Sequence, residues 1–412
     1  MKGRISGLLW LLFWPVAIGS LLVRANYDQQ KPLNNLDQQE APSSTAISTP
    51  LFASLERFAR LVDTSYCLGT TGIRKPFECL SRCKEFPNLT LVTAWSTGIF
   101  FGDSCGFIAV DHGSEQQPSN NASHGASATE EHGAIVVAFR GTYSITNTIV
   151  DLSTMPQKYV PYPSPDNGGD EPPKKPSHEC TNCTVHMGFL HSWKNARDAV
   201  LPELKTLRDK YPNYPIQLVG HSLGGSVACL AALELKVSLG WDNVMVTTYG
   251  EPRVGNDGLA SFIDDVFALR GDTDPENRMY RRVTHVDDPV PLLPPTEFGF
   301  RSHGGEIFIS KSSLSPTEND VYFCTGDEDP QCSAGGDTSV RSVLHRLLHF
   351  FPTTKTSISS YAETMSFPTR LKLWQILFAH RDYFWRLGLC IPGGDPTNWG
   401  QNPYQPINPG EL

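Results

Sequence analysis

The sequence predicts one α/β domain in which helices cover the faces of a central, mostly parallel sheet. From residue 134 to residue 285, apolar segments of strand length alternate with longer segments of helical periodicity. Such alternation is typical of parallel strands joined by helices that pack on the sheet. No internal repeat or change of composition divides this stretch, so we expect a single folded domain.

The expected elements follow one another in regular order. They are strand 134–139, a helix over about 189–210, strand 216–219, a helix over about 225–239, strand 244–249, a helix over about 257–268 and a strand over about 279–285. An earlier apolar run extends from Gly106 to Val110, and a polar insertion over 112–132 separates it from strand 134–139. Two apolar runs joined by a polar loop predict an antiparallel hairpin.

Residues 1–25 have the organisation of a secretory signal peptide. Lys2 and Arg4 precede an apolar run from Leu8 to Val23, and Val23-Arg24-Ala25 satisfies the small-residue rule for cleavage. We therefore predict a secreted, extracellular protein, with an uncleaved membrane anchor as the alternative. No later run reaches membrane-spanning length, so we expect no stable membrane insertion of the mature chain.

The segments that flank the expected domain differ from it in composition. Residues 26–50 lack an apolar period and predict a pro-segment or disordered lead-in. The folded domain is expected over 51–391, because apolar residues recur at helical spacing from Leu51 to Val62. The tail, 392–412, is rich in Pro, Gly and Asn and predicts irregular structure.

Charge and cysteine content restrict the partners and the compartment. With 43 acidic and 34 basic residues the net charge is −9, which disfavours nucleic acid and anionic membrane surfaces as partners. A neutral or water-insoluble substrate remains compatible. Ten cysteines fit an oxidising compartment, and the sequons at Asn88, Asn121 and Asn182 predict glycosylation.

The segment Gly220-His221-Ser222-Leu223-Gly224 matches the pattern G-x-S-x-G. A short β-run ends directly before it and an apolar helical stretch begins directly after it. A strand, a tight turn and a helix together expose a serine hydroxyl on a strained elbow, and glycines are needed where a Cβ would collide with backbone. Ser222 is therefore our candidate nucleophile; the alternative is a glycine-rich turn without chemistry.

A serine nucleophile needs a general base, an orienting carboxylate and donors for the oxyanion. In α/β-hydrolases the carboxylate and then the histidine follow the serine along the chain. Asp287 and Asp288 follow the strand that ends near 285, where the chemistry of such sheets takes place. The downstream histidines are His303, His345, His349 and His380. The required chemistry and the chain order alone decide neither which aspartate nor which histidine acts with Ser222.

Several further motifs follow one another in order over residues 55–391. They are Ala138-Phe139-Arg140-Gly141-Thr142, Val185-His186-Met187-Gly188-Phe189, the elbow, Gly250-Glu251-Pro252-Arg253-Val254-Gly255-Asn256, Asp288-Pro289-Val290-Pro291, and His380 followed by Tyr383 and Phe384. This set resembles the secreted fungal class 3 lipases and their relatives, the feruloyl esterases. The resemblance implies an α/β-hydrolase fold.

The resemblance also implies roles for individual residues. The aspartate two residues before the Val-Pro step is Asp288, and the histidine shortly before the final cysteine is His380. The backbone amides of Leu223 and Thr142 would form the oxyanion hole, and no metal or organic cofactor is implied. The segment around His303 resembles a non-catalytic part of the family that enters a strand.

The resemblance further implies four disulfides. They are Cys67–Cys390, Cys79–Cys83, Cys180–Cys183 and Cys324–Cys332. Cys105 and Cys229 are left over, and we expect both to be buried free thiols. Three stretches depart from the family pattern: the expanded 112–132, the insertion over 161–178 and the lengthened 333–364, in which 341–351 has the apolar spacing of an amphipathic helix.

The segment after Thr142 distinguishes a lipase from a feruloyl esterase. Ile145, Ile149 and Leu152 fall on one face of a helix, with Val150 beside it, and the resemblance to the lipases implies a mobile lid with an apolar underside there. Thr146-Asn147 and the Cys180/Cys183 pair instead resemble the esterases, and a surface helix that packs this face permanently on the domain is the alternative to a lid. We therefore predict a triacylglycerol lipase that acts on lipid esters at an oil–water interface. A feruloyl-type or other soluble carboxylesterase is the alternative, and a non-catalytic secreted binding protein of the same fold is a third possibility. No oligomeric state is predicted.

Overall fold

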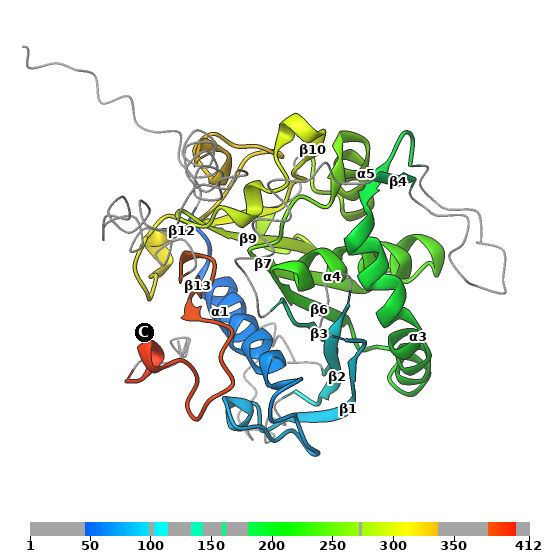
Figure 1. Ribbon diagram of the computed structural model, residues 1–412, viewed down its shortest axis with the longest axis vertical. Helices are drawn as coiled ribbons and strands as arrows, with labels where there is room; N and C mark the ends of the chain where they lie inside the picture. The colour runs from blue at the N-terminus through cyan, green and yellow to red at the C-terminus, as the bar shows by residue number, and fades with distance from the viewer. Residues whose placement is uncertain are drawn as a thin grey trace, which may run out of the picture. The chain divides into compact units, whose positions relative to one another are not determined.

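One mixed sheet forms the centre of the computed structural model (Figure 1). The structure describes residues 46–98, 103–113, 133–142, 159–161, 180–271, 274–336 and 378–400, and eight strands of these residues form the sheet. Their order is β1 (Leu89–Ser96), β2 (Cys105–Asp111), β3 (Ala134–Phe139), β6 (Ile216–His221), β7 (Val244–Tyr249), β9 (Tyr280–His285), β11 (Glu306–Ile309) and β12 (Val321–Phe323).

The five strands from β3 to β11 run parallel, and the outer strands pair antiparallel. Strands β2 and β3 pair antiparallel from Gly106↔Phe139 to Asp111↔Ala134, which confirms the predicted hairpin across the polar insertion. The parallel centre likewise confirms the predicted fold class. Parallel strands end at a common edge, so β3, β6, β7 and β9 deliver their following loops to one side of the sheet.

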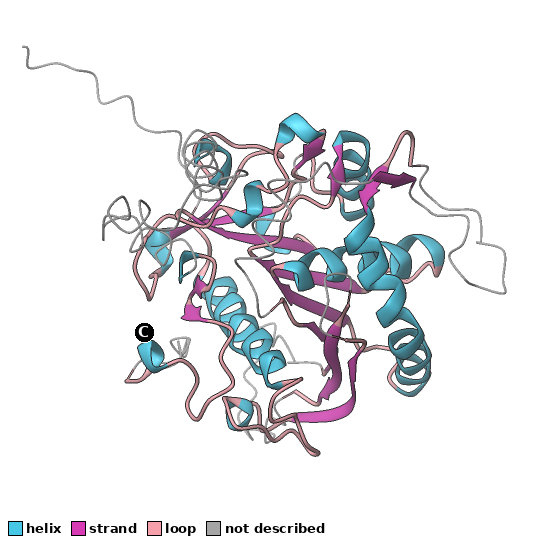
Figure 2. Cartoon of the chain, in the orientation of Figure 1, coloured by secondary structure: helices cyan, strands magenta, loops and turns pink. Residues whose placement is uncertain are grey.

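Helices cover both faces of this sheet (Figure 2). They are α1 (Thr49–Thr64), α3 (Met187–Lys210), α4 (Leu223–Leu233) and α5 (Asp257–Phe267). Side chains of a strand point alternately to the two faces. In β6, Leu218 packs into the core that contains α3, α4 and α5, whereas Val219 packs into the core that contains α1. Strands buried on both faces explain the nearly continuous apolar runs in the sequence.

Two helix starts differ from the sequence expectation. Helix α3 begins at Met187 because Nδ1 of His186 accepts the backbone N–H groups of Gly188 and Phe189, at 3.1 and 3.3 Å. Histidine is not among the preferred N-cap residues, so this helix start carries no cap signal that can be recognised from sequence. Helix α4 begins at Leu223, directly after the elbow, and continues as a π-helical turn over Glu234–Ser238.

A second sheet was not predicted. Among the described residues it contains β4 (Tyr159–Pro161), β5 (Thr184–His186), β8 (Gly255–Asn256) and β10 (Phe300–Arg301). Strands of two or three residues are too short to give an apolar period. Near the end of the described chain, β13 (Asp382–Tyr383) and β14 (Trp385–Arg386) form a further small hairpin.

Four disulfides are present, and they are the four pairs that the resemblance implies. They join Cys67 to Cys390, Cys79 to Cys83, Cys180 to Cys183 and Cys324 to Cys332. Among the described cysteines, Cys105 and Cys229 are free and buried, as predicted. The first disulfide joins the short turn that follows α1 to Cys390, 323 residues further along the chain.

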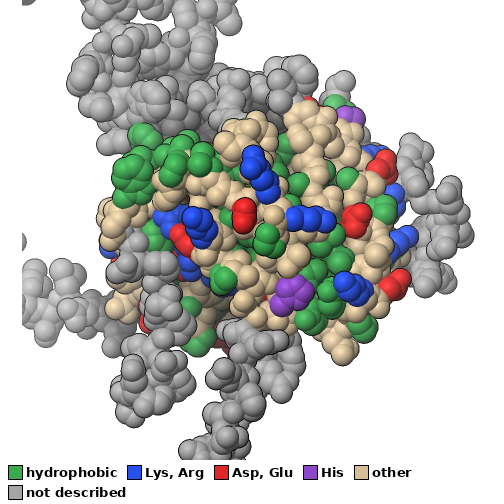
Figure 3. Space-filling model, turned by 90° about the horizontal axis from the view of Figure 1, so that it is seen from below, with side chains coloured by type: hydrophobic (Ala, Val, Ile, Leu, Met, Phe, Trp, Pro, Cys, Tyr) green, Lys and Arg blue, Asp and Glu red, His purple; other side chains and the backbone are tan. Residues whose placement is uncertain are grey.

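The described surface carries charges of both signs next to one another on the face in Figure 3, and hydrophobic side chains gather toward one edge of it. No helix within the described ranges is long and apolar enough to cross a membrane. Asn88 and Asn182 are exposed, as a glycosylated asparagine must be, and their glycosylation stays a prediction.

Other predicted features lie outside the described residues: 1–25, most of 26–50, Asn121, the lid residues Ile145, Ile149, Val150 and Leu152, the insertion after 161, and 341–351.

Candidate active site

Ser222 occupies the turn between β6 and α4. Its backbone has φ 57° and ψ −132°, a conformation that is rare for a residue with a Cβ. A Cβ on Gly220 would collide with the backbone of Gly224, so the turn closes only with glycine there. Backbone hydrogen bonds of 2.9 Å hold the turn, from Ser222 N to Tyr249 O and from Gly225 N to Ser222 O. The predicted elbow is therefore formed as the sequence pattern indicates.

His380 and Asp288 meet beside this elbow although 92 residues separate them. Nδ1 of His380 lies 3.0 and 2.9 Å from the two carboxylate oxygens of Asp288. Asp288 follows β9 and is buried, whereas Asp287 is exposed and its backbone N–H contacts His285. Of the two candidate aspartates, the structure brings Asp288 to a histidine.

Two atoms of this site have unused hydrogen-bonding capacity. Oγ of Ser222 and Nε2 of His380 are both buried, and neither has a hydrogen-bond partner among the described residues. Buried polar atoms are normally paired, and the exceptions gather at functional sites. The two unpaired atoms are a hydroxyl and the ring nitrogen that faces away from the carboxylate.

The environment of Asp288 keeps it ionised. Burial by itself raises the pKa of this carboxyl, but His380 and the donors Tyr383 and Val290 outweigh burial, so the pKa lies below its ordinary value. The hydroxyl of Tyr383 donates to Oδ2, and the backbone N–H of Val290 donates to Oδ1 at 2.9 Å. An ionised Asp288 fixes the proton of His380 on Nδ1 and leaves Nε2 with a lone pair.

Gly250 lies directly behind the histidine and the aspartate. Its φ is +59°, and a Cβ there would stand 2.8 Å from Cε1 of His380 and 2.9 Å from both Oδ2 of Asp288 and the hydroxyl of Tyr383. Any side chain at this position would therefore displace the histidine or the carboxylate. Gly250 and Tyr383 belong to motifs of the sequence, but their roles became clear only from these contacts.

The two candidate oxyanion amides follow two adjacent strands of the sheet, β3 and β6. Leu223 is the first residue of α4, so its N–H has no acceptor within the helix and lies at the positive end of the helix dipole. Thr142 follows β3, whose Phe139 pairs with Gly220 of β6. A Cβ on the preceding residue, Gly141, would stand 2.9 Å from Cβ of Ser222, so the Thr142 segment passes close to the elbow.

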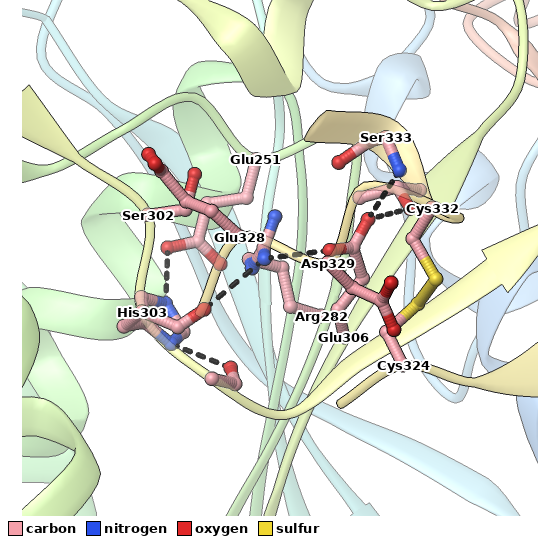
Figure 4. A network of polar contacts seen from close by, with 12 residues as sticks. Glu251, Arg282, Ser302, His303, Glu306, Cys324, Glu328, Asp329, Cys332 and Ser333 are labelled. Atoms are coloured by element: carbon pink, nitrogen blue, oxygen red, sulfur yellow. Dashed lines mark hydrogen bonds and ion pairs between the residues drawn. A yellow bond between two sulfur atoms is a disulfide. The ribbon is translucent and has the colours of Figure 1, made fainter. Parts of the chain in front are cut away.

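His303, the rival histidine, belongs to a different polar cluster (Figure 4). Its Nε2 lies 3.3 Å from Oε1 of Glu251, and its Nδ1 lies 2.9 Å from the backbone oxygen of Gly304. Both ring nitrogens therefore have an acceptor within hydrogen-bond distance, and His303 is held beside the buried carboxylate of Glu251. Burial raises the pKa of Glu251, but the contacts with His303 and Thr248 lower it by more, so the pKa lies below the ordinary value for glutamate.

Cys229 lies beside this pair. Ligand atoms of Cys229, Glu251 and His303 lie within 4.8 Å of one another, a set that a metal ion could use. The carboxylate oxygens of Glu251, however, already accept from Thr248 at 2.6 Å and Tyr280 at 2.9 Å, besides His303. Protein donors thus use the lone pairs that a metal would need, and we interpret the cluster as structural.

The elbow, the buried carboxylate and the histidine, in that chain order on a parallel sheet, are those of an α/β-hydrolase that uses serine. The family model described as Lipase (class 3) matches residues 136–298. The chain is 64% identical over 371 residues to "Secreted mono- and diacylglycerol lipase 2" of Gibberella zeae, covering 90% of this chain and 89% of that protein. The chain therefore belongs to the class 3 lipase family.

Two further matches agree. Lipase A of Sodiomyces alcalophilus is 57% identical over 397 residues, 95% of this chain and 93% of that protein. The structure of the nonglycosylated LIP2 lipase of Yarrowia lipolytica, 27% identical, superposes with a TM-score of 0.63 and covers 84% of this chain and 98% of that chain. These relatives confirm the prediction of a secreted lipase that hydrolyses lipid esters, and they do not favour the feruloyl esterase alternative.

Proposed function

We propose that this lipase cleaves acylglycerol esters by acyl transfer through Ser222, His380 and Asp288. His380 takes the Ser222 proton on Nε2 as the hydroxyl oxygen attacks the ester carbonyl. Asp288 holds the ring and stabilises the imidazolium that forms. His380 then protonates the leaving glycerol oxygen, and water cleaves the acyl-enzyme by the same steps in reverse order.

One observation carries this proposal. The two buried atoms of the site without hydrogen-bond partners among the described residues, Oγ of Ser222 and Nε2 of His380, are the two between which the reaction moves a proton. The other ring nitrogen of His380, Nδ1, is held by both carboxylate oxygens of Asp288. A structural histidine would be expected to use both ring nitrogens, as His303 does.

The oxyanion hole is assigned to the backbone N–H groups of Leu223 and Thr142. The position of Leu223 at the helix start supports this, because a helix N-terminus favours negative charge. Backbone donors fixed in place cost no reorganisation when the tetrahedral intermediate forms. Removing one such donor in a comparable hydrolase lowers kcat by roughly 10²–10³-fold.

The substrate class is assigned from the relatives. The Gibberella zeae protein is named a mono- and diacylglycerol lipase, so we include partial glycerides with triacylglycerols among the substrates of this chain. The apolar spacing of Ile145, Ile149 and Leu152 supports a lid that opens at an oil–water surface, where its apolar underside would be covered.

Rates on four substrates test the assignment: emulsified triolein, diolein, monoolein and soluble methyl ferulate. We expect all three glycerides to be cleaved faster than methyl ferulate, and a fluorophosphonate probe to label Ser222. Ser222→Ala should lose roughly 10⁶-fold in kcat and all labelling while keeping its fold, as removal of a triad serine does in a comparable hydrolase. Activity retained in that variant, or preference for methyl ferulate, would overturn the proposal.

A further inference from the structure

A chain of buried hydrogen bonds leads from Tyr66, beside the Gly141–Thr142 segment, to the backbone of His380. Tyr66 lies in the short turn η1 (Ser65–Cys67) after α1 and is 2% exposed. The Gly141 backbone passes directly beside the hydroxyl of Tyr66, since a Cβ on Gly141 would stand 2.5 Å from that oxygen. That hydroxyl lies 2.5 Å from Nδ1 of His221, whose Nε2 lies 2.7 Å from the backbone oxygen of His380.

The direction of each bond in this chain is determined. The carbonyl of His380 only accepts, so Nε2 of His221 carries the proton. Burial, and next the nearby His380, lower the pKa of His221 to about 3, so the ring is neutral and Nδ1 is an acceptor. Tyr66 therefore donates to His221. All donors point the same way, an arrangement in which neighbouring hydrogen bonds strengthen one another.

The hydrogen-bond chain reaches the candidate active site at three places, each beside a reacting group. Gly141 precedes the oxyanion residue Thr142, His221 precedes Ser222, and the final acceptor belongs to His380. We propose that Tyr66 and His221 are positioning residues that fix the backbone of His380, and so its Nε2, relative to Ser222. This inference rests on the proposed function, because it assumes that His380 is the general base.

The contact with Asp288 does not by itself fix Nε2. It holds the ring at Nδ1, and a ring held at one atom still tilts and slides about that atom. The hydrogen bond from His221 to the backbone oxygen of His380 supplies a second fixed point. It holds the backbone from which the side chain of His380 extends, whereas Asp288 holds the ring. The rings of His221 and His380 lie with their centroids 4.7 Å apart at 30°, so they also pack on one another.

Tyr66 is itself firmly held. The next residue, Cys67, is bonded to Cys390, ten residues after His380, so one disulfide joins the turn that carries Tyr66 to the segment that carries the base. On the other side, the guanidinium of Arg140 donates to the backbone oxygen of Leu68. The turn η1 therefore connects the segment of Thr142 to the segment of His380. These contacts are within the protein and do not involve the substrate.

Tyr66→Phe tests the inference because it keeps the ring and removes the hydroxyl. With a soluble short-chain ester we expect kcat per active site, titrated with a fluorophosphonate, to fall by roughly 10-fold to 100-fold with KM within about twofold, as a small misplacement of a catalytic group does. Tyr280→Phe is the matched control: Tyr280 is also fully buried, and its hydroxyl donates to Glu251 in the structural cluster around His303, outside the hydrogen-bond chain. It should keep the wild-type kcat.

Two substitutions of His221 separate positioning from packing. Glutamine reaches the position of Nε2 and retains a donor toward His380, whereas asparagine reaches that of Nδ1 and retains only the contact with Tyr66. We expect His221→Gln to keep at least about tenfold more kcat than His221→Asn. Equal losses in the two variants, or an unchanged kcat in Tyr66→Phe, would overturn the inference.

The proposed function fails separately. If His380→Ala retains turnover, the base is wrongly assigned, whatever Tyr66 does. If His380→Ala is inactive while Tyr66→Phe matches wild type, the triad stands and the positioning role is wrong.

Discussion

The hydroxyl of Tyr383 donates to Oδ2 of Asp288, the same carboxylate oxygen that lies 2.9 Å from Nδ1 of His380. Tyr383, three residues after His380, thus contacts the carboxylate that orients His380. The backbone of Phe384 supports this return with a positive φ of 52°. The late motif quoted in the sequence is explained by this arrangement, since His380 and Tyr383 act on one carboxylate.

Tyr383→Phe should lower kcat by roughly 10-fold to 100-fold, because a hydrogen bond to a charged group contributes roughly 1.5–3 kcal/mol. Loss of a donor to the ionised form raises the pKa of Asp288, so the acid limb of the kcat/KM profile should move to higher pH. Tyr322→Phe is the control, since the hydroxyl of Tyr322 donates to the backbone of Gln331 at the surface. A profile identical to wild type would show that the hydroxyl does not matter.

His380→Ala and His303→Ala should fail in different ways. We expect His380→Ala to lose nearly all turnover with little change in stability. His303→Ala leaves the buried carboxylate of Glu251 without one of its hydrogen-bond partners, which should cost roughly 1–3 kcal/mol of unfolding free energy. Its kcat per titrated active site should stay near wild type. The reverse pattern, with turnover lost in His303→Ala and kept in His380→Ala, would exchange the two roles.

The lid prediction is tested at the solubility limit of an ester substrate. The rate of the wild-type protein should rise when the substrate passes that limit, because an oil surface covers the apolar face of an open lid. Ile145→Ser together with Ile149→Ser should weaken the rise while sparing soluble short-chain esters. Smooth saturation of the wild type through the limit would remove the lid from the mechanism.

Asp63 predicts a dependence of stability on pH. Burial is the largest influence on this carboxyl and raises its pKa from 3.8 to about 7, although Gly388 donates to it at 2.7 Å. The folded protein therefore binds a proton that the unfolded chain has lost between these values. Its unfolding free energy should fall as pH rises through this window, by up to roughly 4 kcal/mol.

Asp63→Asn removes this titration. Urea unfolding at pH 5 and pH 8 should show a smaller loss of stability on raising the pH than in wild type. Asp209→Asn, at an exposed position, should leave the wild-type difference unchanged. If the Asp63→Asn and wild-type differences coincide, Asp63 does not bind the extra proton.

The Cys67–Cys390 disulfide should contribute far more stability than the short ones. It closes a loop of 323 residues, for which the chain-entropy model gives about 5–6 kcal/mol. The Cys180–Cys183 loop, with a separation of three, gives only about 2 kcal/mol in the same model. Paired serine substitutions of each disulfide, compared by urea unfolding, check the contrast; equal losses would contradict it.

The sequence by itself determined the fold class, the elbow and the chain order of the site. Strands buried on both faces leave continuous apolar runs, and an elbow needs glycines at fixed spacing, so both features are local and readable. The choice of Asp288 and His380 came from the resemblance. Mechanical arguments left two aspartates and four histidines open, because a residue's burial and partners depend on segments distant in the chain.

Only the tertiary structure decided which polar groups meet. His303 and His380 are both buried histidines beside a carboxylate, and they differ in whether the second ring nitrogen has an acceptor. The link from Tyr66 through His221 to His380 spans residues 155 and 159 positions apart, and no periodicity encodes such a contact. Hydrogen-bond partners follow from how the sheet, the N-terminal helix and the disulfide bring chain segments together, which is a property of packing rather than of local sequence.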